Sequence, residues 1–471
     1  MPPKIAVLFA ATLVFSGGLF GGETFVGSFA EPRDGGTLDT AHSTFDGRTV
    51  TIVPRAEANE AVGNVPRWRN IYFAIRGLRG KAPVFRLPLA SRRAGGMILA
   101  NDDTSFRNVR LVWSYDGDGA EWHEFDRYTR TGRDWTDWRI DAQNRHAFTR
   151  DVVYVSINER FPVGDFYSWL KTKVFTHPLV EPTPSETLPG SFIIGYESGA
   201  PASAACSRPI PDTPLFAFQI REPHAHPRRL VVLVSGQHPY EGQNKIALEG
   251  ALEWILNSTS DAARRYRANY VTLVYPFVNP TGELAGLWRG TARAPDKDTN
   301  RNWQTAVTDP GSDPAIDTVI IHRNAMQKDI AALGLGEPYA AFDYHQNFGD
   351  REDAPDYVMH STPAPRLLAV AARGPVAHLD FESYFRRLTS RTRIADMPSD
   401  LSDEETLRGY MIDRGALLPL TFERSVYHDL ATEREFGAAT VQALVESVPA
   451  PAAELASKLA AGERTPMRPS S

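Results

Sequence analysis

The hydrophobic positions between residues 38 and 182 occur in short runs that are rich in β-branched and aromatic residues. Such runs lie at residues 71–75, 109–113 and 152–156, and turn-forming residues separate them, as in the Asp-Gly-Asp-Gly segment at 116–119. Short apolar runs between turns predict strands. We therefore predict an N-terminal antiparallel β-sandwich over residues 38–182. Its tryptophans favour core packing over a carbohydrate-binding platform, and the Asp-Gly repeat favours a hairpin turn over a calcium site.

The pattern after residue 185 is different, because extended apolar runs alternate with segments of helical periodicity. A Pro-rich stretch at 181–185 precedes this part and is typical of a linker. Strands are predicted at residues 229–235, 271–275, 340–344 and 417–422, and helices at 244–256, 317–333, 432–446 and 452–461. This alternation predicts an α/β/α domain at 189–463 with a mixed, mostly parallel sheet, followed by a polar tail at 464–471. Ligands of such domains bind at the carboxyl ends of the strands.

Composition narrows the function classes. The 471 residues, 42% hydrophobic and 23% charged, suffice for two or three domains and exclude a disordered, collagen-like or coiled-coil chain. Lys and Arg number 51 against 57 Asp and Glu, and the arginines are scattered, so no nucleic-acid partner is expected. The single cysteine, Cys206, can form neither an internal disulfide nor a thiolate zinc site.

Residues 1–30 resemble a secretory signal peptide. Lys4 precedes an uncharged apolar run at residues 5–15, and the small residues Ser28 and Ala30 suit a cleavage site. The alternative is an uncleaved N-terminal anchor. Export predicts a periplasmic or secreted protein, whereas without a functional signal the protein would be cytoplasmic. Since no other segment has 18 uninterrupted apolar residues, no further membrane contact is expected.

Polar residues at the ends of the predicted strands carry the candidate chemistry. His238 and Glu241 lie three residues apart, directly after the strand at 229–235, where both can face one metal ion. His345 lies at the end of the third strand and can supply a further ligand. Two histidines and a glutamate with an open fourth position form a zinc-hydrolase arrangement. Glu423, at the end of the fourth strand, offers a carboxylate as general base.

Two arginines and an asparagine lie between these clusters. Arg289 follows Trp288, and Asn300 and Arg301 belong to a polar segment at 298–303. The planar guanidinium group suits a carboxylate, and a second arginine can stabilise an oxyanion. Structural roles are the alternative, because Arg301 can serve an ion pair.

Six short motifs in this order resemble the M14 zinc carboxypeptidase family. They are HPYE at 238–241, NPTG at 279–282, LWRGTAR at 287–293, DTNRNW at 298–303, DYH at 343–345 and LTFE at 420–423. The resemblance covers about residues 189–449. Residues 167–170 (YSWL) and the His238-Pro239 pair resemble the cytosolic-carboxypeptidase-like branch, whose members carry an N-terminal β-sandwich domain. The implied fold is therefore a β-sandwich followed by an α/β/α zinc-carboxypeptidase domain.

The resemblance implies a metal site at known positions of this chain. One zinc ion per chain would be bound by His238, Glu241 and His345. Asp298 would orient a ligand histidine, as metal-bound histidines usually require. One departure is Tyr240, which stands where relatives often carry Gly or Arg.

The resemblance also implies roles toward the substrate. Arg289 would polarise the scissile carbonyl, Asn300 and Arg301 would hold the C-terminal carboxylate, and Glu423 would act as general base. The mobile tyrosine of many family members has no clear counterpart here, and Tyr410 is the nearest candidate. Arg408 is a candidate pocket residue that would favour acidic C-terminal residues.

The implied function is that of a zinc-dependent metallocarboxypeptidase acting on the C-termini of peptides or proteins. One alternative keeps the zinc chemistry but acts on peptidoglycan stem peptides. Another is a binding protein on a degenerate peptidase scaffold. That protein would lack a ligand or the base, whereas this sequence contains each of them.

Overall fold

The computed structural model describes residues 25–447 except for 33–34, 56–69, 89, 93–97, 101–109, 118–120, 133–138, 204–205, 207, 224, 305–316, 348–355, 361–380 and 399–405. The apolar run at 5–15, the predicted helix at 452–461 and the tail at 464–471 lie outside the described residues. Within the described part, none of the helices combines the length and hydropathy needed to cross a bilayer.

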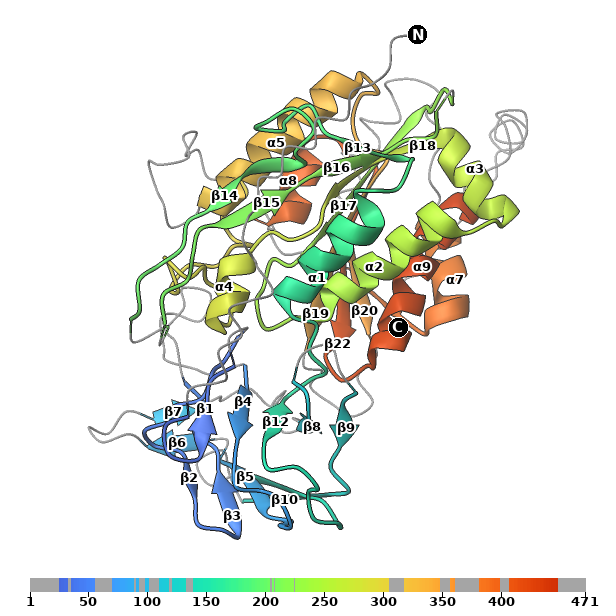
Figure 1. Cartoon of the computed structure of the whole chain (residues 1–471). Helices are drawn as coiled ribbons and strands as arrows, with labels where there is room; N and C mark the ends of the chain where they lie inside the picture. The colour runs from blue at the N-terminus through green and yellow to red at the C-terminus, as the bar shows by residue number, and fades with distance from the viewer. Residues whose placement is uncertain are drawn as a thin grey trace.

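The N-terminal region contains two five-stranded sheets (Figure 1). The first has the order β1 (Phe29–Ala30), β4 (Tyr72–Ile75), β12 (Val153–Ser156), β8 (Val112–Ser114) and β9 (His123–Glu124). The second has the order β10 (Arg127–Thr131), β11 (Arg139–Gln143), β5 (Val84–Pro88), β3 (Thr49–Thr51) and β2 (Thr44–Phe45). A short hairpin joins β6 (Ala90–Arg92) and β7 (Ile98–Ala100). Side chains of both five-stranded sheets, such as Phe73 and Phe85, share one hydrophobic cluster, which we call the N-terminal core.

One strand pair corrects the prediction of a purely antiparallel arrangement. Strands β3 and β5 of the second sheet pair in parallel. Between them the chain crosses to the first sheet, forms β4 and returns. Because a crossover brings the next strand back in the same direction, the pair is parallel rather than a hairpin.

The first strand also corrects the end of the predicted signal peptide. Phe29 and Ala30 pair with Ile75 and Ala74 of β4, and both are buried. Phe29 is part of the N-terminal core. Cleavage after Ala30 would remove this strand, so a leader that ends at residue 30 does not fit the fold.

The C-terminal region is built on an eight-stranded mixed sheet (Figure 1). Its order is β13 (Val180–Pro182), β16 (Phe218–Ile220), β18 (Tyr270–Tyr275), β17 (Arg229–Ser235), β19 (Ala340–Asn347), β22 (Leu418–Ser425), β20 (Tyr357–His360) and β21 (Ala395–Pro398). The four central strands, β18 to β22 in this order, are parallel, as are β20 and β21, and the other pairs are antiparallel. Strands β14 (Ile193–Glu197) and β15 (Thr213–Phe216) form a separate two-stranded sheet. The mixed sheet with a parallel centre agrees with the prediction.

Helices cover both faces of this sheet. On β17, Val231 and Leu233 contribute to one hydrophobic cluster, whereas Leu230, Val232 and Val234 contribute to another. Since successive side chains of a strand point to opposite faces, the two clusters lie on opposite sides of the sheet. The first also contains α1 (Val163–Trp169), α2 (Asn244–Asn257), α3 (Asp261–Asn269), α7 (Phe381–Thr392) and α9 (Leu430–Ser447), and the second contains α5 (Asp317–Leu333) and α8 (Leu407–Asp413). Figure 1 shows α1, α2, α7 and α9 grouped on one side.

The segment predicted as a linker is part of the C-terminal region. Val163 of α1 and Val180 of β13 are buried in the first of these two clusters, and β13 forms an edge strand next to β16. Ser185 donates hydrogen bonds from its backbone N–H and its hydroxyl to Asp329, both at 2.8 Å. The change between the two cores therefore lies between residues 157 and 163 rather than at 182. A Pro- and Ser-rich composition does not distinguish a linker from an edge strand.

The two regions share the N-terminal core. Tyr240, Trp288 and Val426 belong to the C-terminal region but are buried in this core. Across the same boundary, Arg55 donates a hydrogen bond to the carbonyl of Ala285 in α4 (Pro280–Ala285) at 2.8 Å. The three core residues adjoin segments that carry candidate site residues, so the N-terminal region packs directly against the candidate site.

Candidate active site

A tight turn after β17 brings His238 and Glu241 together. Gly236 has a φ of 73°, and a Cβ at this position would lie 2.3 Å from the Phe277 ring. Only glycine tolerates both the left-handed backbone and this close approach. The chain then turns through His238 and Glu241 before α2 begins at Asn244.

His345 and Glu423 lie on neighbouring parallel strands in the middle of the sheet. They occupy equivalent positions in the register of β19 and β22. Both strands extend further than predicted, to Asn347 and Ser425, so the two residues lie within strands rather than at their ends. The ordered backbone of a central strand holds each side chain in place.

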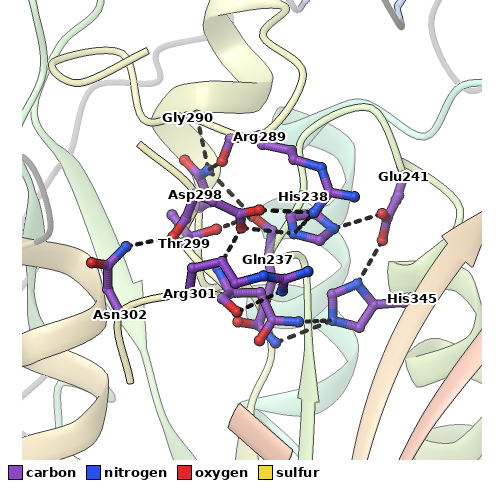
Figure 2. A network of polar contacts seen from close by, with 12 residues as sticks. Gln237, His238, Glu241, Arg289, Gly290, Asp298, Thr299, Arg301, Asn302 and His345 are labelled. Carbon is purple, nitrogen blue, oxygen red and sulfur yellow. Dashed lines mark hydrogen bonds and ion pairs between the residues drawn. The ribbon is translucent and has the colours of Figure 1, made fainter. Parts of the chain in front are cut away.

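His238, Glu241 and His345 form one buried cluster (Figure 2). Glu241 lies between the rings, with Oε1 2.7 Å from His238 Nδ1 and Oε2 2.9 Å from His345 Nδ1. One ligand atom from each of the three residues lies within 4.8 Å of the others, and no second such group of His, Cys, Asp or Glu occurs among the described residues. Two imidazoles and a carboxylate are a donor set that zinc prefers, so these residues fit a zinc ion.

The outer nitrogen of each ring faces a second carboxylate. His238 Nε2 lies 3.1 Å from Asp298 Oδ1, and His345 Nε2 lies 3.0 Å from Asp343 Oδ2. Asp298 thus contacts one of the two histidines of the cluster. Asp343 is a residue that sequence reasoning missed, although its spacing of two from His345 on a strand puts both side chains on one face.

Arg289 and Asp298 form an ion pair at the edge of the cluster. Arg289 Nη1 donates to Asp298 Oδ2 at 2.8 Å and lies 3.1 Å from His238 Nε2. Burial alone raises the pKa of Asp298, but the charges of Arg289 and His238 outweigh it and hold that pKa well below its usual value. Asp298 is therefore an anion that holds both a histidine and an arginine in place.

Asn300 and Arg301 take different environments. Asn300 is buried, and its Oδ1 accepts a hydrogen bond from the backbone N–H of Leu407 at 3.0 Å. Its Nδ2 lies 3.4 Å from His345 Nε2. Arg301 is exposed and donates from Nη1 to the carbonyl of Asn300 at 2.9 Å. An exposed guanidinium beside this buried cluster of two histidines and a glutamate can meet an anionic solute.

Glu423 lies close enough to the cluster to interact with its charges. The pKa of Glu423 is raised to about 8, because burial and the charge of Glu241 raise it by more than the charge of His345 lowers it. A carboxyl buried beside two histidines and a glutamate is placed to take part in proton transfer.

Tyr410 and Arg408, both on α8, have different surroundings. Tyr410 is buried in the hydrophobic cluster that also contains α5 and α8. Its ring centroid lies 6.0 Å from that of Trp303. This packing makes Tyr410 a core residue and corrects its assignment as a mobile tyrosine. Arg408 is buried one residue after Leu407, whose N–H contacts Asn300, so it lies next to the candidate site.

Tyr240, which departs from the family pattern, packs between the His238 turn and the N-terminal region. Its ring is buried in the N-terminal core and lies parallel to that of His238, with centroids 6.3 Å apart. Its hydroxyl donates to the carbonyl of Gln346 at 3.4 Å. Tyr240 therefore connects the His238 turn to the N-terminal region.

Solved structures share this architecture over nearly the whole chain. A metallo-carboxypeptidase from Burkholderia cenocepacia superimposes with a TM-score of 0.66, covering 89% of this chain and 98% of that chain at 17% identity. The chain has the metallo-carboxypeptidase fold. A second metallo-carboxypeptidase, from Pseudomonas aeruginosa in complex with (2-guanidinoethylmercapto)succinic acid, gives a TM-score of 0.64 at 14% identity and the same coverages.

Sequence similarity to proteins of the carboxypeptidase group is confined to short stretches. Cytosolic carboxypeptidase 3 of Bos taurus is 31% identical over 84 residues, which are 18% of this chain and 8% of the relative. Cytosolic carboxypeptidase 1 of Xenopus laevis is 29% identical over 118 residues, which are 25% of this chain and 9% of the relative. The chain thus spans less than a tenth of the curated relatives it matches. No family model matches the sequence.

Proposed function

We propose that the chain is a zinc metallocarboxypeptidase that hydrolyses the C-terminal peptide bond of peptides or proteins. The observation that carries the proposal is the placement of Glu241 between the Nδ1 atoms of His238 and His345, with all three residues buried. The metallo-carboxypeptidase fold supports the same conclusion. His238, Glu241 and His345 would hold one zinc ion through their inward-facing atoms.

The residues around the metal position would have different roles in hydrolysis. Zinc, when bound, supplies a Lewis acid that polarises a carbonyl and lowers the pKa of a water. Glu423 accepts the proton of the attacking water and passes it to the leaving amine. Arg289, held by Asp298, directs its positive charge toward the oxygen on which negative charge develops.

Asn300 and Arg301 restrict the reaction to chain ends. The guanidinium of Arg301 would pair with a free carboxylate, next to Asn300, whose backbone carbonyl accepts from Arg301 and whose side-chain amide lies 3.4 Å from His345 Nε2. A bound C-terminus then places the last peptide bond at the reactive centre. Arg408, buried beside Asn300, would favour an acidic C-terminal side chain.

Two variants test the assignment of metal and base. Wild-type protein is expected to bind about one zinc ion per chain, and His345→Ala should lose zinc and peptidase activity together. Glu423→Gln should keep its zinc while turnover falls by roughly a hundredfold or more, because only the base is removed. Metal analysis and cleavage of peptides ending in Glu or Leu are the measurements. Full zinc occupancy in His345→Ala would contradict the ligand assignment, and equal cleavage of both peptides would remove the preference assigned to Arg408.

We also propose that the protein is exported by a leader that ends before Val26. The support is the apolar run at residues 5–15 together with the place of Phe29 in the N-terminal core. N-terminal sequencing of protein recovered outside the cytoplasm tests this, and a mature chain that begins at or after residue 31 would contradict it.

A further inference from the structure

We propose that Asp343 is a positioning residue that fixes the tautomer of His345, and that Gln237 and Trp303 hold Asp343 ready for this task. The inference rests on the proposed function, because the tautomer matters when His345 binds a metal ion. Trp303, Gln237, Asp343 and His345 form a buried chain of contacts on the side of His345 that faces away from Glu241. Figure 2 shows the contacts of Gln237 and His345.

The first contact fixes the orientation of an amide. Trp303 Nε1 lies 2.7 Å from Gln237 Oε1. An indole N–H can only donate a hydrogen bond, so the oxygen of the amide faces Trp303 and its NH₂ group faces the other way. That NH₂ group lies 2.7 Å from Asp343 Oδ2 and donates to it.

The second contact fixes the histidine. The same oxygen, Asp343 Oδ2, lies 3.0 Å from His345 Nε2. Since this oxygen accepts a hydrogen bond from Gln237, it acts as an acceptor toward His345 as well, and Nε2 carries the proton. The lone pair of His345 is then on Nδ1, which lies 2.9 Å from Glu241 Oε2 on the side where these two residues would share a metal ion.

Two neighbouring amides favour the opposite tautomer of His345, with the proton on Nδ1. An acceptor at Asp343 is therefore needed to keep the proton on Nε2. Gln237 Nε2 and Asn300 Nδ2 lie 3.2 and 3.4 Å from His345 Nε2. Both are amide NH₂ groups, so without an acceptor at Asp343 they would favour an unprotonated Nε2. The proton would then lie on Nδ1 and block the position of the metal. Asp343 lies closer than either amide and decides the outcome.

The two histidines are therefore held by different means. Asp298, which faces His238, also accepts hydrogen bonds from Arg289 and from the backbone N–H of Asn300. The side-chain contacts of Asp343 among the described residues are to Gln237 and His345. Asp298 thus contacts several groups of the site, whereas His345 is the one residue of the metal-binding set that Asp343 contacts.

Zinc affinity of the full-length protein, measured by competition with a chelating indicator, tests the inference. Asp343→Asn keeps the size of the side chain but presents an NH₂ group to His345, and zinc binding should weaken by roughly ten- to a hundredfold. The matched control is Asp329→Asn, because Asp329 is also buried but binds Ser185 and Tyr275 in another part of the fold. Its zinc affinity should equal that of the wild type.

A second variant acts at a distance from the metal position. Trp303→Phe keeps an aromatic ring but removes the N–H that orients Gln237, so zinc affinity should fall, by less than in Asp343→Asn. Wild-type affinity in both variants would overturn this inference while leaving the proposed function intact. A wild-type protein that binds no zinc would overturn both.

Discussion

Arg289 contacts two groups of the site through one nitrogen. Its Nη1 reaches both Asp298 and His238, whereas Arg301 contacts a backbone carbonyl and is otherwise exposed. An arginine that is already paired is held rigidly, and an exposed one is available to a ligand. This difference supports the assignment of Arg301 rather than Arg289 to the carboxylate of the substrate.

Replacing Arg301 should therefore impair binding of a free C-terminus. Arg301→Ala is expected to lower kcat/KM by roughly a hundredfold or more, because a charge-assisted guanidinium–carboxylate pair contributes strongly and its loss leaves the carboxylate unpaired. Amidating the C-terminus of the substrate should have a similar effect on the wild type. The two changes should not add, since both remove one interaction.

The control for this experiment is Arg264→Ala. Arg264 is an exposed arginine on α3 that pairs with Asp261, and its loss should leave peptidase kinetics unchanged. If amidated peptides are cleaved as fast as free acids by an enzyme that does not need Arg301, carboxypeptidase action is excluded.

The sequence predicts the residues whose chemistry is visible in a motif, but not those whose role depends on packing. His238, Glu241 and His345 are recognisable because metal-binding residue types recur at the predicted strand ends, whereas Asp298 is recognisable only through the resemblance to the family. Gln237 looks like one more polar residue before a histidine, and only the position of Trp303 shows that its amide has a fixed direction. The error at Tyr410 has the same origin, since the sequence does not show which way an aromatic ring packs.

Strand β22 joins the site to a second polar cluster. Arg424 follows Glu423 and forms buried ion pairs with Asp356 and Glu433. Asp356 also contacts His428 Nε2 at 2.9 Å and accepts a hydrogen bond from the Ser425 backbone N–H at 2.7 Å. These contacts attach β22 to the segment that leads into β20, on the side of Glu423 away from His345.

Loss of Asp356 should destabilise the protein in a pH-dependent way. Burial raises the pKa of Asp356, but His428 and Arg424 outweigh it and bring that pKa below its ordinary value near 3.8. A carboxyl with a lowered folded-state pKa stabilises the fold above its unfolded pKa, and this stability is lost as the pH falls. Asp356→Asn should cost about 3 kcal/mol at pH 7, because it leaves Arg424 with one partner fewer.

Denaturant unfolding between pH 7 and pH 3 measures this effect. The difference between wild type and Asp356→Asn should be constant near neutral pH and shrink as the pH falls below about 4. A difference that grows as the pH falls would contradict the role assigned to Asp356.

The sequence predicts individual helices and strands more accurately than it predicts which hydrophobic core they join. The strand at 229–235 and the helix at 317–333 form over the predicted residues, because continuous apolar runs and helical periodicity are local signals. The assignment of residues 163–182 to the N-terminal region is wrong because membership of a core depends on contacts that are distant in sequence.

The shared core makes the N-terminal region relevant to catalysis. Tyr240 lies next to Glu241, Trp288 next to Arg289, and Val426 three residues after Glu423. Each of these anchors is buried with residues of the N-terminal sheets. A change in that packing is therefore transmitted to the candidate site without any contact with the substrate.

A pair of identical substitutions separates this effect from simple loss of stability. Val426→Ala and Val441→Ala each remove two methyl groups from a fully buried valine, the first in the N-terminal core and the second on α9. Both should cost about 2 kcal/mol in stability. Only Val426→Ala should also lower kcat/KM several-fold at a temperature where both variants are folded. Equal kinetics in the two variants would show that the shared core does not position the site.

The place of Val426 in the N-terminal core also bears on the order in which the protein can fold. The sheets that form this core are synthesised first, yet the core is complete only when Tyr240, Trp288 and finally Val426 have been added. Contacts between residues so distant in the chain slow folding, because the intervening loop must close before the contact forms. A ribosome-bound chain would keep part of its first core exposed until nearly all of the protein has been made. The N-terminal region is thus the first part to be synthesised and among the last to reach its final packing.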